Sequence, residues 1–186
     1  MGVKTLRNTY DSIKNVLITD AEVENTLTGE KIETKAIWDT GATNTSITKR
    51  LAAAINLKKF SKAEIRGVHG TKEVPVFYAK VTLQNKSISL EIPITGCDEL
   101  SNDGSVGLLI GMDIISKGDF CVSNYQGKTT MTFRTPSVEC TDYAQEVTEA
   151  NKYLRIYESR KKHGNEKCPC GSNKLFKNCH GKYFKE

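Results

Sequence analysis

The sequence has no long apolar run, and this absence argues against a membrane-spanning helix. Its first residues, MGVKTLRNTYDSIK, also lack the apolar core of a signal peptide. We therefore expect a cytoplasmic protein with no membrane span. In a reducing compartment disulfides are disfavoured, so any cluster of cysteines is better explained by metal binding.

The composition also lacks the features of a disordered chain, because 38% of the 186 residues are hydrophobic and 8% are aromatic. This length suits one ordinary domain with a small appendage. The net charge of +5 is unevenly distributed. Residues 152–186 contain 10 Lys or Arg against 3 Asp or Glu, whereas residues 1–151 contain 17 against 19. The basic character therefore belongs to the C-terminal segment.

Short β-rich segments separated by turn signals dominate residues 1–136, and they predict a mainly β fold that is closed into a barrel or sandwich. The predicted strands are Val16–Ile18, Ala21–Val23, Ile32–Trp38, Val74–Leu83, Ser87–Ile94, Leu108–Ile110, Phe120–Val122 and Thr129–Phe133. Residues Thr48–Leu57 predict a short helix, and Met112–Ile115 predicts a helical turn.

The most informative motif is Asp39-Thr40-Gly41-Ala42, which directly follows an apolar strand and precedes the predicted short helix. It places one carboxylate at a strand end, beside a hydroxyl group and a glycine that lets backbone N–H groups approach. This arrangement suits acid–base activation of water. The alternative is an aspartate in a surface turn that caps a helix. The sequence contains no second D-[ST]-G motif.

About seventy residues after this motif comes Leu109-Ile110-Gly111, continued by Met112-Asp113. Together these residues resemble the retropepsin-like aspartic proteases, over about residues 15–135. The resemblance implies an acid-protease β-barrel with one short helix, and hydrolysis of peptide bonds without a catalytic cofactor. It implies that two carboxylates share one proton and hold the attacking water. Because the chain has one motif, a homodimer is needed to complete each site.

The same resemblance assigns roles to individual residues. Asp39 is the general acid and base, Thr40 supports the site across the dimer, and Gly41 brings the main chain close to the carboxylate. Ala42 stands where pepsin-like enzymes have a hydroxyl residue, so we expect a pH optimum nearer neutrality. Substrate contacts are expected from Ala42, Ile110 and a flap hairpin whose tip comprises Gly67, Val68, His69 and Gly70. His69 is either an exposed loop residue or a contact with substrate.

Three cysteines and a histidine lie close together near the C-terminus in the pattern C-x-C-x8-C-H, formed by Cys168, Cys170, Cys179 and His180. Four such ligands in a segment too short to bury a core suit a tetrahedral zinc ion. A disulfide with a spare thiol is the disfavoured alternative. Residues 165–181 resemble the SEC-C zinc motif, which implies a structural Zn²⁺ site with no open position.

The sequence predicts three regions, a protease domain at 1–136, a connecting helix or linker at 137–164 and a SEC-C module at 165–186. The apolar stripe of the helix either packs on the body or binds a partner. The basic residues around the zinc motif are either a solvated surface or a contact for a chaperone, a ribosome, nucleic acid or anionic lipid. The whole chain is thus interpreted as a homodimeric aspartic endopeptidase whose tail recruits substrate or locates the enzyme. The alternative is a non-catalytic dimeric scaffold that works through its tail.

Overall fold

The computed structural model describes residues 2–67, 70–159 and 165–184. The chain divides into two compact units, Met1–Glu139 and Cys140–Glu186.

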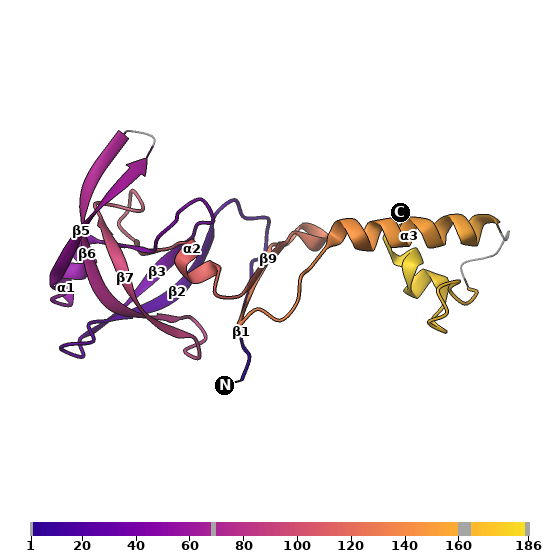
Figure 1. The fold of residues 1–186 in the computed structure, drawn as a ribbon, viewed down its shortest axis with the longest axis horizontal. Coiled ribbons are helices and arrows are strands. Elements are labelled where there is room, and N and C mark those ends of the chain that lie inside the picture. Colours follow the sequence, from indigo (N-terminus) through magenta and orange to yellow (C-terminus); the bar gives the residue numbers. More distant parts are fainter. Residues whose placement is uncertain (1, 68–69, 160–164, 185–186) are drawn as a thin grey trace. The chain divides into compact units, whose positions relative to one another are not determined.

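The first unit is built almost entirely of β-strands, as expected, and most of them close into a barrel (Figure 1). The strand order in the barrel is β2-β3-β8-β4-β7-β6, and pairing between β6 and β2 closes it. β5 pairs with β6 and is the last strand of this sheet. Two neighbour pairs, β3–β8 and β4–β7, are parallel, and the others are antiparallel. The strands are β2 (Leu17–Glu24), β3 (Lys31–Trp38), β4 (Ser46–Thr48), β5 (Lys59–Gly67), β6 (Gly70–Leu83), β7 (Ser89–Cys97) and β8 (Val106–Ile110).

Apolar side chains fill the interior of the barrel, because alternate residues of each strand point inward. Val23, Val81 and Leu108 have no exposed surface. Helix α1 (Lys49–Ala54) adds Leu51 and Ala52 to this core, and its first turn is capped by the Thr48 hydroxyl, which accepts from Leu51 N at 3.3 Å. The predicted short helix is therefore confirmed, although it ends three residues before Leu57.

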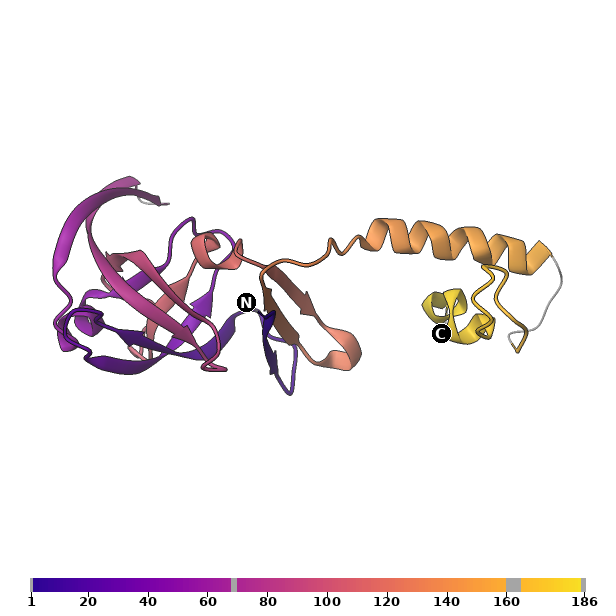
Figure 2. The same ribbon diagram turned by 60° about the horizontal axis from the view of Figure 1, so that its bottom comes forward.

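A second, three-stranded sheet lies beside the barrel, in the order β1-β10-β9 (Figure 2). Its strands are β1 (Lys4–Thr9), β9 (Asp119–Ser123) and β10 (Thr130–Thr135), and β9 and β10 correspond to the predicted strands Phe120–Val122 and Thr129–Phe133. The sheet packs on the barrel through Trp38, whose ring stacks on Phe120 with centroids 5.4 Å apart. The buried indole N–H donates to Thr19 Oγ1 at 2.9 Å, which satisfies its one polar atom.

Several strands differ from the sequence prediction in extent. The segments Val16–Ile18 and Ala21–Val23 are parts of one strand, β2, because buried Thr19 and exposed Asp20 continue the alternation between them. The sequence did not predict β1 or β4, which are short and mostly polar, and it anticipated β5 only as an arm of the flap hairpin, without bounds.

The second unit combines helix α3 (Tyr143–Ser159) with a segment of short 3₁₀ turns at Phe176–Asn178 and His180–Phe184. The two parts pack through aromatic rings, with Tyr157 stacked on Phe176 at a centroid distance of 4.0 Å. The apolar stripe of α3 thus covers the Cys/His segment, a role for which its sequence alone gave no sign. Among the described residues, no helix is long and apolar enough to cross a membrane.

Candidate active site

Asp39 is the first residue after β3, and its position is fixed by the neighbouring strand end. Its backbone N–H donates to Ile110 O at 3.0 Å. The residue is half-buried, and its carboxylate accepts a hydrogen bond from Gly41 N at 2.8 Å. A Cβ at Gly41 would lie 3.2 Å from Asp39 Oδ1, which is tighter than an ordinary contact. The glycine therefore brings its main chain close to the acid, as the sequence motif requires.

The loop that follows Asp39 is held against the start of helix α2 (Met112–Ile115) by backbone hydrogen bonds. Met112 N donates to Ala42 O at 2.8 Å, and Asp113 N donates to Thr43 O at 3.1 Å. Gly111, the residue before Met112, lies so close to the loop that an added Cβ would be 2.5 Å from the Asn44 carbonyl carbon. The two sequence motifs, D-T-G-A and I-G-M-D, therefore form one structure.

A side-chain network that the sequence analysis did not include closes this loop. The Asp113 carboxylate accepts from Thr45 N (3.0 and 2.9 Å), Thr45 Oγ1 (2.7 Å) and Ile114 N (2.9 Å). Thr45 is fully buried, and its hydroxyl oxygen also accepts from Gly111 N at 3.2 Å. Asp113 belongs to a motif that the sequence reveals, although the motif alone assigns it no role, and nothing local in the sequence distinguishes Thr45.

The other predicted site residues are distributed around this loop. Thr40 and Gly41 are exposed, and Ala42 is half-buried. Ile110 is fully buried, and the structure assigns its carbonyl, not its side chain, to the support of Asp39. Its contact with substrate stays a prediction, as do the catalytic roles of the loop residues.

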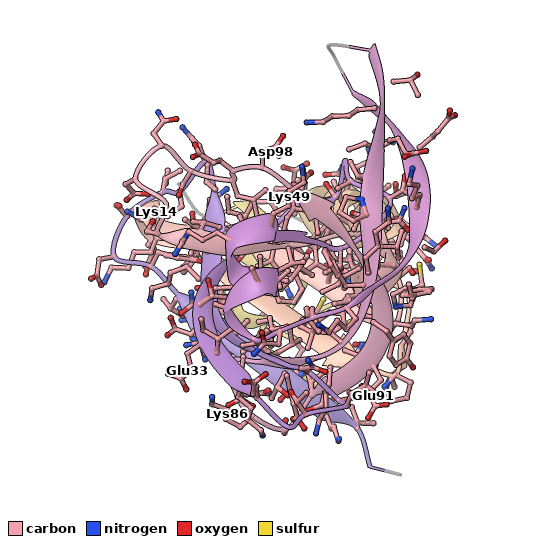
Figure 3. The ribbon with its side chains drawn as sticks, turned by 90° about the vertical axis from the view of Figure 1, so that its left-hand side faces the viewer. Lys14, Glu33, Lys49, Lys86, Glu91 and Asp98 are labelled. Atoms are coloured by element: carbon pink, nitrogen blue, oxygen red, sulfur yellow. The ribbon has the colours of Figure 1, made fainter. Side chains whose placement is uncertain are left out.

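The predicted flap corresponds to a hairpin of β5 and β6, which projects from the barrel in Figure 1 and whose last paired residues are Gly67 and Gly70. Val68 and His69, placed at its tip by the sequence analysis, lie outside the described residues. One arm of the hairpin is tied to the barrel by Asp98, which lies beside Lys49 in Figure 3. Its carboxylate pairs with Lys49 at 2.7 Å and with Lys72 of β6 at 2.5 Å. Hydrogen bonds from Lys49 and Lys72 lower the pKa of Asp98 to about 2.

In the second unit, Cys168, Cys170, Cys179 and His180 converge, with their ligand atoms all within 4.8 Å of one another. Cys170 Sγ and Cys179 Sγ are 3.7 Å apart, and His180 Nδ1 lies 3.3 Å from Cys168 Sγ. A tetrahedral zinc with Zn–S bonds of about 2.3 Å would separate two sulfurs by roughly 3.8 Å. The donor set and its spacing thus fit a four-coordinate metal ion held entirely by protein groups.

Helix α3 supports this cluster from one side. The ring of Tyr153 contacts the ring of His180, with centroids 4.4 Å apart. A ring held in this way orients the imidazole toward the three sulfurs. The cluster therefore depends on residues outside the Cys/His motif.

Comparison with known protein families agrees with both halves of this description. The family model described as "gag-polyprotein putative aspartyl protease" matches residues 23–117, which is 95 of the 186 residues. A model of the SEC-C motif matches residues 165–182. The chain belongs to the family of retroviral-type aspartyl proteases and carries a C-terminal SEC-C motif. The comparison with curated proteins found no match.

Three of the similar solved structures come from a bacterium and from two viruses. A retropepsin-like aspartic protease from Rickettsia conorii has a TM-score of 0.48 and 14% identity, and the match covers 73% of this chain and 97% of that one. The EIAV protease complexed with the inhibitor HBY-793 has a TM-score of 0.44 and 18% identity, with 57% and 89% covered. The protease of simian foamy virus (mac) has a TM-score of 0.37 and 22% identity, with 52% and 89% covered.

Proposed function

We propose that the chain is an aspartic endopeptidase that acts as a homodimer, in which each copy contributes one Asp39. The observation that carries this proposal is the environment of the Asp39 carboxylate. Asp39 is half-buried at a strand end, its carboxylate accepts the Gly41 N–H, and it sits in a loop that is fastened to residues 110–113 at several points. A surface aspartate that only caps a turn has no need of such a loop.

The chemistry follows from placing two such carboxylates beside each other. Two like charges a few ångströms apart cannot both ionise readily, so the pair holds one proton. The ionised partner then takes a proton from a water molecule held between the two, while the protonated partner gives its proton to the peptide group. The hairpin of β5 and β6 would close over the peptide and exclude bulk water.

The test uses the full-length, metal-loaded protein and a peptide library between pH 4 and 8, a range that includes the near-neutral optimum expected from Ala42. The wild type is expected to cleave, and Asp39→Asn is expected to lose activity by at least about a thousandfold, because the water loses its base. Asp20→Asn is the matched control, since Asp20 is exposed and pairs only with Lys35 among the described residues.

Mixing provides a second readout of the shared site. Adding excess Asp39→Asn to the wild type should reduce cleavage below the level expected from dilution, because mixed dimers hold a single carboxylate. Cleavage by Asp39→Asn at the wild-type rate would contradict the proposal. A stable, metal-loaded wild-type dimer that cleaves no peptide would favour the alternative, a dimeric scaffold that works through its basic tail.

For the second unit we propose a structural Zn²⁺ held by Cys168, Cys170, Cys179 and His180. Its role would be to fold a small module that recruits a protein substrate or locates the enzyme. In the described part of the module, residues 165–184, four lysines stand against one acidic residue, Glu166. This excess of positive charge favours an acidic partner, such as a chaperone surface, a ribosome or nucleic acid.

A further inference from the structure

A small pocket lies between the barrel and the three-stranded sheet of the first unit, where β10 ends and β7 begins. Its volume is about 220 Å³. The described residues of its lining include four apolar ones, Ile88, Leu90, Phe133 and Pro136. Ile88 and Phe133 are only 2% and 1% exposed and belong to the core of the first unit, so the pocket reaches down to that core. The pocket is therefore suited to an apolar group.

Two exposed lysines also line this pocket, Lys4 from β1 and Lys117 from the segment that follows α2. Lys4 is opposite Thr135 in the pairing of β1 with β10, and the Thr135 hydroxyl donates to Lys117 O at 2.9 Å. One threonine thus lies beside both lysines. Neither lysine forms an ion pair with a described carboxylate, and none of the described lining residues is acidic. The mouth of the pocket therefore carries positive charge.

The position of Lys4 within β1 explains how a charge comes to lie beside an apolar pocket. Residues two apart in a strand share a face, so Lys4 lies on the same face as Leu6. Leu6 is buried in the core and is paired with Phe133. A lysine on such a face can lay its alkyl stem along apolar groups and keep its ammonium in water. Lys4 thus occupies a core-facing position exactly where the core ends.

The carboxylates that are nearest in sequence do not neutralise the two lysines. Asp119, two residues after Lys117, is paired with Arg134 at 2.6 Å. Glu91 directly follows Leu90 in β7, and alternation places its side chain on the other face of that strand. A bound anion would supply the negative charge that these residues do not.

We propose that this pocket binds an anion that carries a short alkyl chain, with the chain on the apolar lining and the anionic group at Lys4 and Lys117. The pocket has the volume of about seven water molecules at roughly 30 Å³ each, and a methylene group takes a similar volume, so a chain of about six to eight carbons fits. An alkyl chain brings no further polar group. The end of a peptide would bring amides, for which the apolar lining offers no partner. The proposal does not rest on the protease function.

The test titrates the full-length, metal-loaded protein with octanoate and with octyl phosphate, each below its micelle concentration, in a calorimeter. Trp38 emission gives a second signal, because its ring contacts that of Phe133 in the pocket lining, with centroids 5.5 Å apart. Saturable binding of one molecule per chain is expected, and the tighter of the two ligands identifies the anionic group. Butyrate should bind at least about tenfold more weakly than octanoate, since each buried methylene group adds about fourfold to the affinity.

Two variants remove the charges and keep unbranched side chains. Lys4→Met and Lys117→Met are each expected to weaken octanoate binding about threefold, and the double variant about tenfold, because ion pairs of exposed ammonium groups are modest. Octan-1-ol, which has the chain without the charge, should bind all of them equally. Lys14→Met is the matched control, since Lys14 is an exposed lysine outside the described lining. Asp39→Asn should also bind octanoate like the wild type.

An NMR titration of the wild type locates the site without any variant. The amide signals of Ser89 and Thr135, which line the pocket, should shift most, and that of Gly41 should not shift. Binding that meets these expectations supports the proposal whether or not the protein cleaves peptides. The proposal is overturned if neither anion saturates the protein, if the double variant binds octanoate as the wild type does, or if the shifts lie elsewhere. Tighter binding of N-acetyl-leucine than of octanoate also overturns it, in favour of a peptide end.

Discussion

At the scale of single residues, the shape of the Asp39 loop depends on a second carboxylate, that of Asp113. This group accepts hydrogen bonds from the backbone and hydroxyl of Thr45, and Thr45 is fully buried. When a buried hydrogen-bond donor loses its acceptor, the folded state is destabilised by the full desolvation cost of that donor. Asp113 therefore serves as a positioning residue for the loop, distinct from the acid that the loop presents.

Replacing Asp113 by alanine should lower the free energy of unfolding by about 1–3 kcal/mol, because Thr45 N and Oγ1 are left without an acceptor. Urea unfolding followed by the fluorescence of Trp38 measures this change. Asp113→Asn, which keeps one acceptor oxygen, should fall between the wild type and the alanine variant. Equal stability of the alanine variant and the wild type would show that the network is not needed.

The sequence predicted some of these residues and not others. Asp39 and Gly41 could be recognised because a turn directly after an apolar strand is a local pattern. The bonds from Thr45 to Asp113 join residues 68 positions apart, and no local pattern records such a contact. Ile110 was recognised as part of a motif, but its backbone carbonyl, not its side chain, contacts Asp39.

At the scale of elements, β9 and β10 are fastened to the segment that follows them by one carboxylate. Asp119 accepts from Ser137 Oγ, from Val138 N at 3.0 Å and from Arg134 Nη2 at 2.6 Å. These hydrogen bonds, the one from Ser137 foremost, lower the pKa of Asp119 to about 2. The group thus stays ionised in the folded protein at pH values where it would bind a proton in the unfolded chain.

This depressed pKa predicts a specific acid sensitivity. A carboxyl with a lower pKa in the folded state contributes stability above its unfolded pKa of about 4, and loses it as the pH falls toward about 2. Asp119→Asn should therefore unfold with a smaller difference in urea midpoint between pH 5 and pH 2.5 than the wild type. Asp98 and Asp103 have the same depressed pKa, so the difference should shrink without vanishing. An unchanged difference in the variant would contradict this role of Asp119.

The elements themselves were predicted unevenly. β6, β9 and β10 have alternating or β-branched residues, and the sequence predicted strands in all three, whereas β5, the other arm of the flap, was not among the predicted strands. β1, with the sequence KTLRNT, has one fully buried residue, Leu6, and forms because β10 offers it an edge. Pairing with a strand more than a hundred residues away decides the conformation of β1, so no local sequence pattern could have predicted this strand.

At the scale of the whole molecule, the two units carry separate spectroscopic reporters. The one tryptophan, Trp38, lies in the first unit. Helix α3 has 17 residues, against 6 in α1 and 4 in α2, so most of the helical signal comes from the second unit. The emission of Trp38 therefore reports on the first unit, and the helical signal reports mainly on the second.

Removal of metal with a chelator should reduce the ellipticity at 222 nm and leave the emission of Trp38 unchanged. The reason is that α3 packs through Tyr153 and Tyr157 on the Cys/His segment, which has too few apolar residues to fold without its ion. Cys168→Ser should reproduce this loss, and Cys140→Ser, which changes an exposed cysteine outside the cluster, should not. Ellipticity that survives complete removal of the metal would show that α3 and the segment fold without it.

The sequence by itself determined the fold class of the body, which is mainly β, and two sets of reactive side chains. These are the one D-T-G acid and the four ligands whose spacing suits a metal ion. Each of these is a local property, set by residue type and by spacings of ten residues or fewer. The tertiary structure alone decided which distant groups complete them, namely Asp113 on Thr45, Tyr153 on His180 and Phe120 on Trp38. Such contacts depend on how strands and helices pack, and packing is a property of the folded chain rather than of any segment within it.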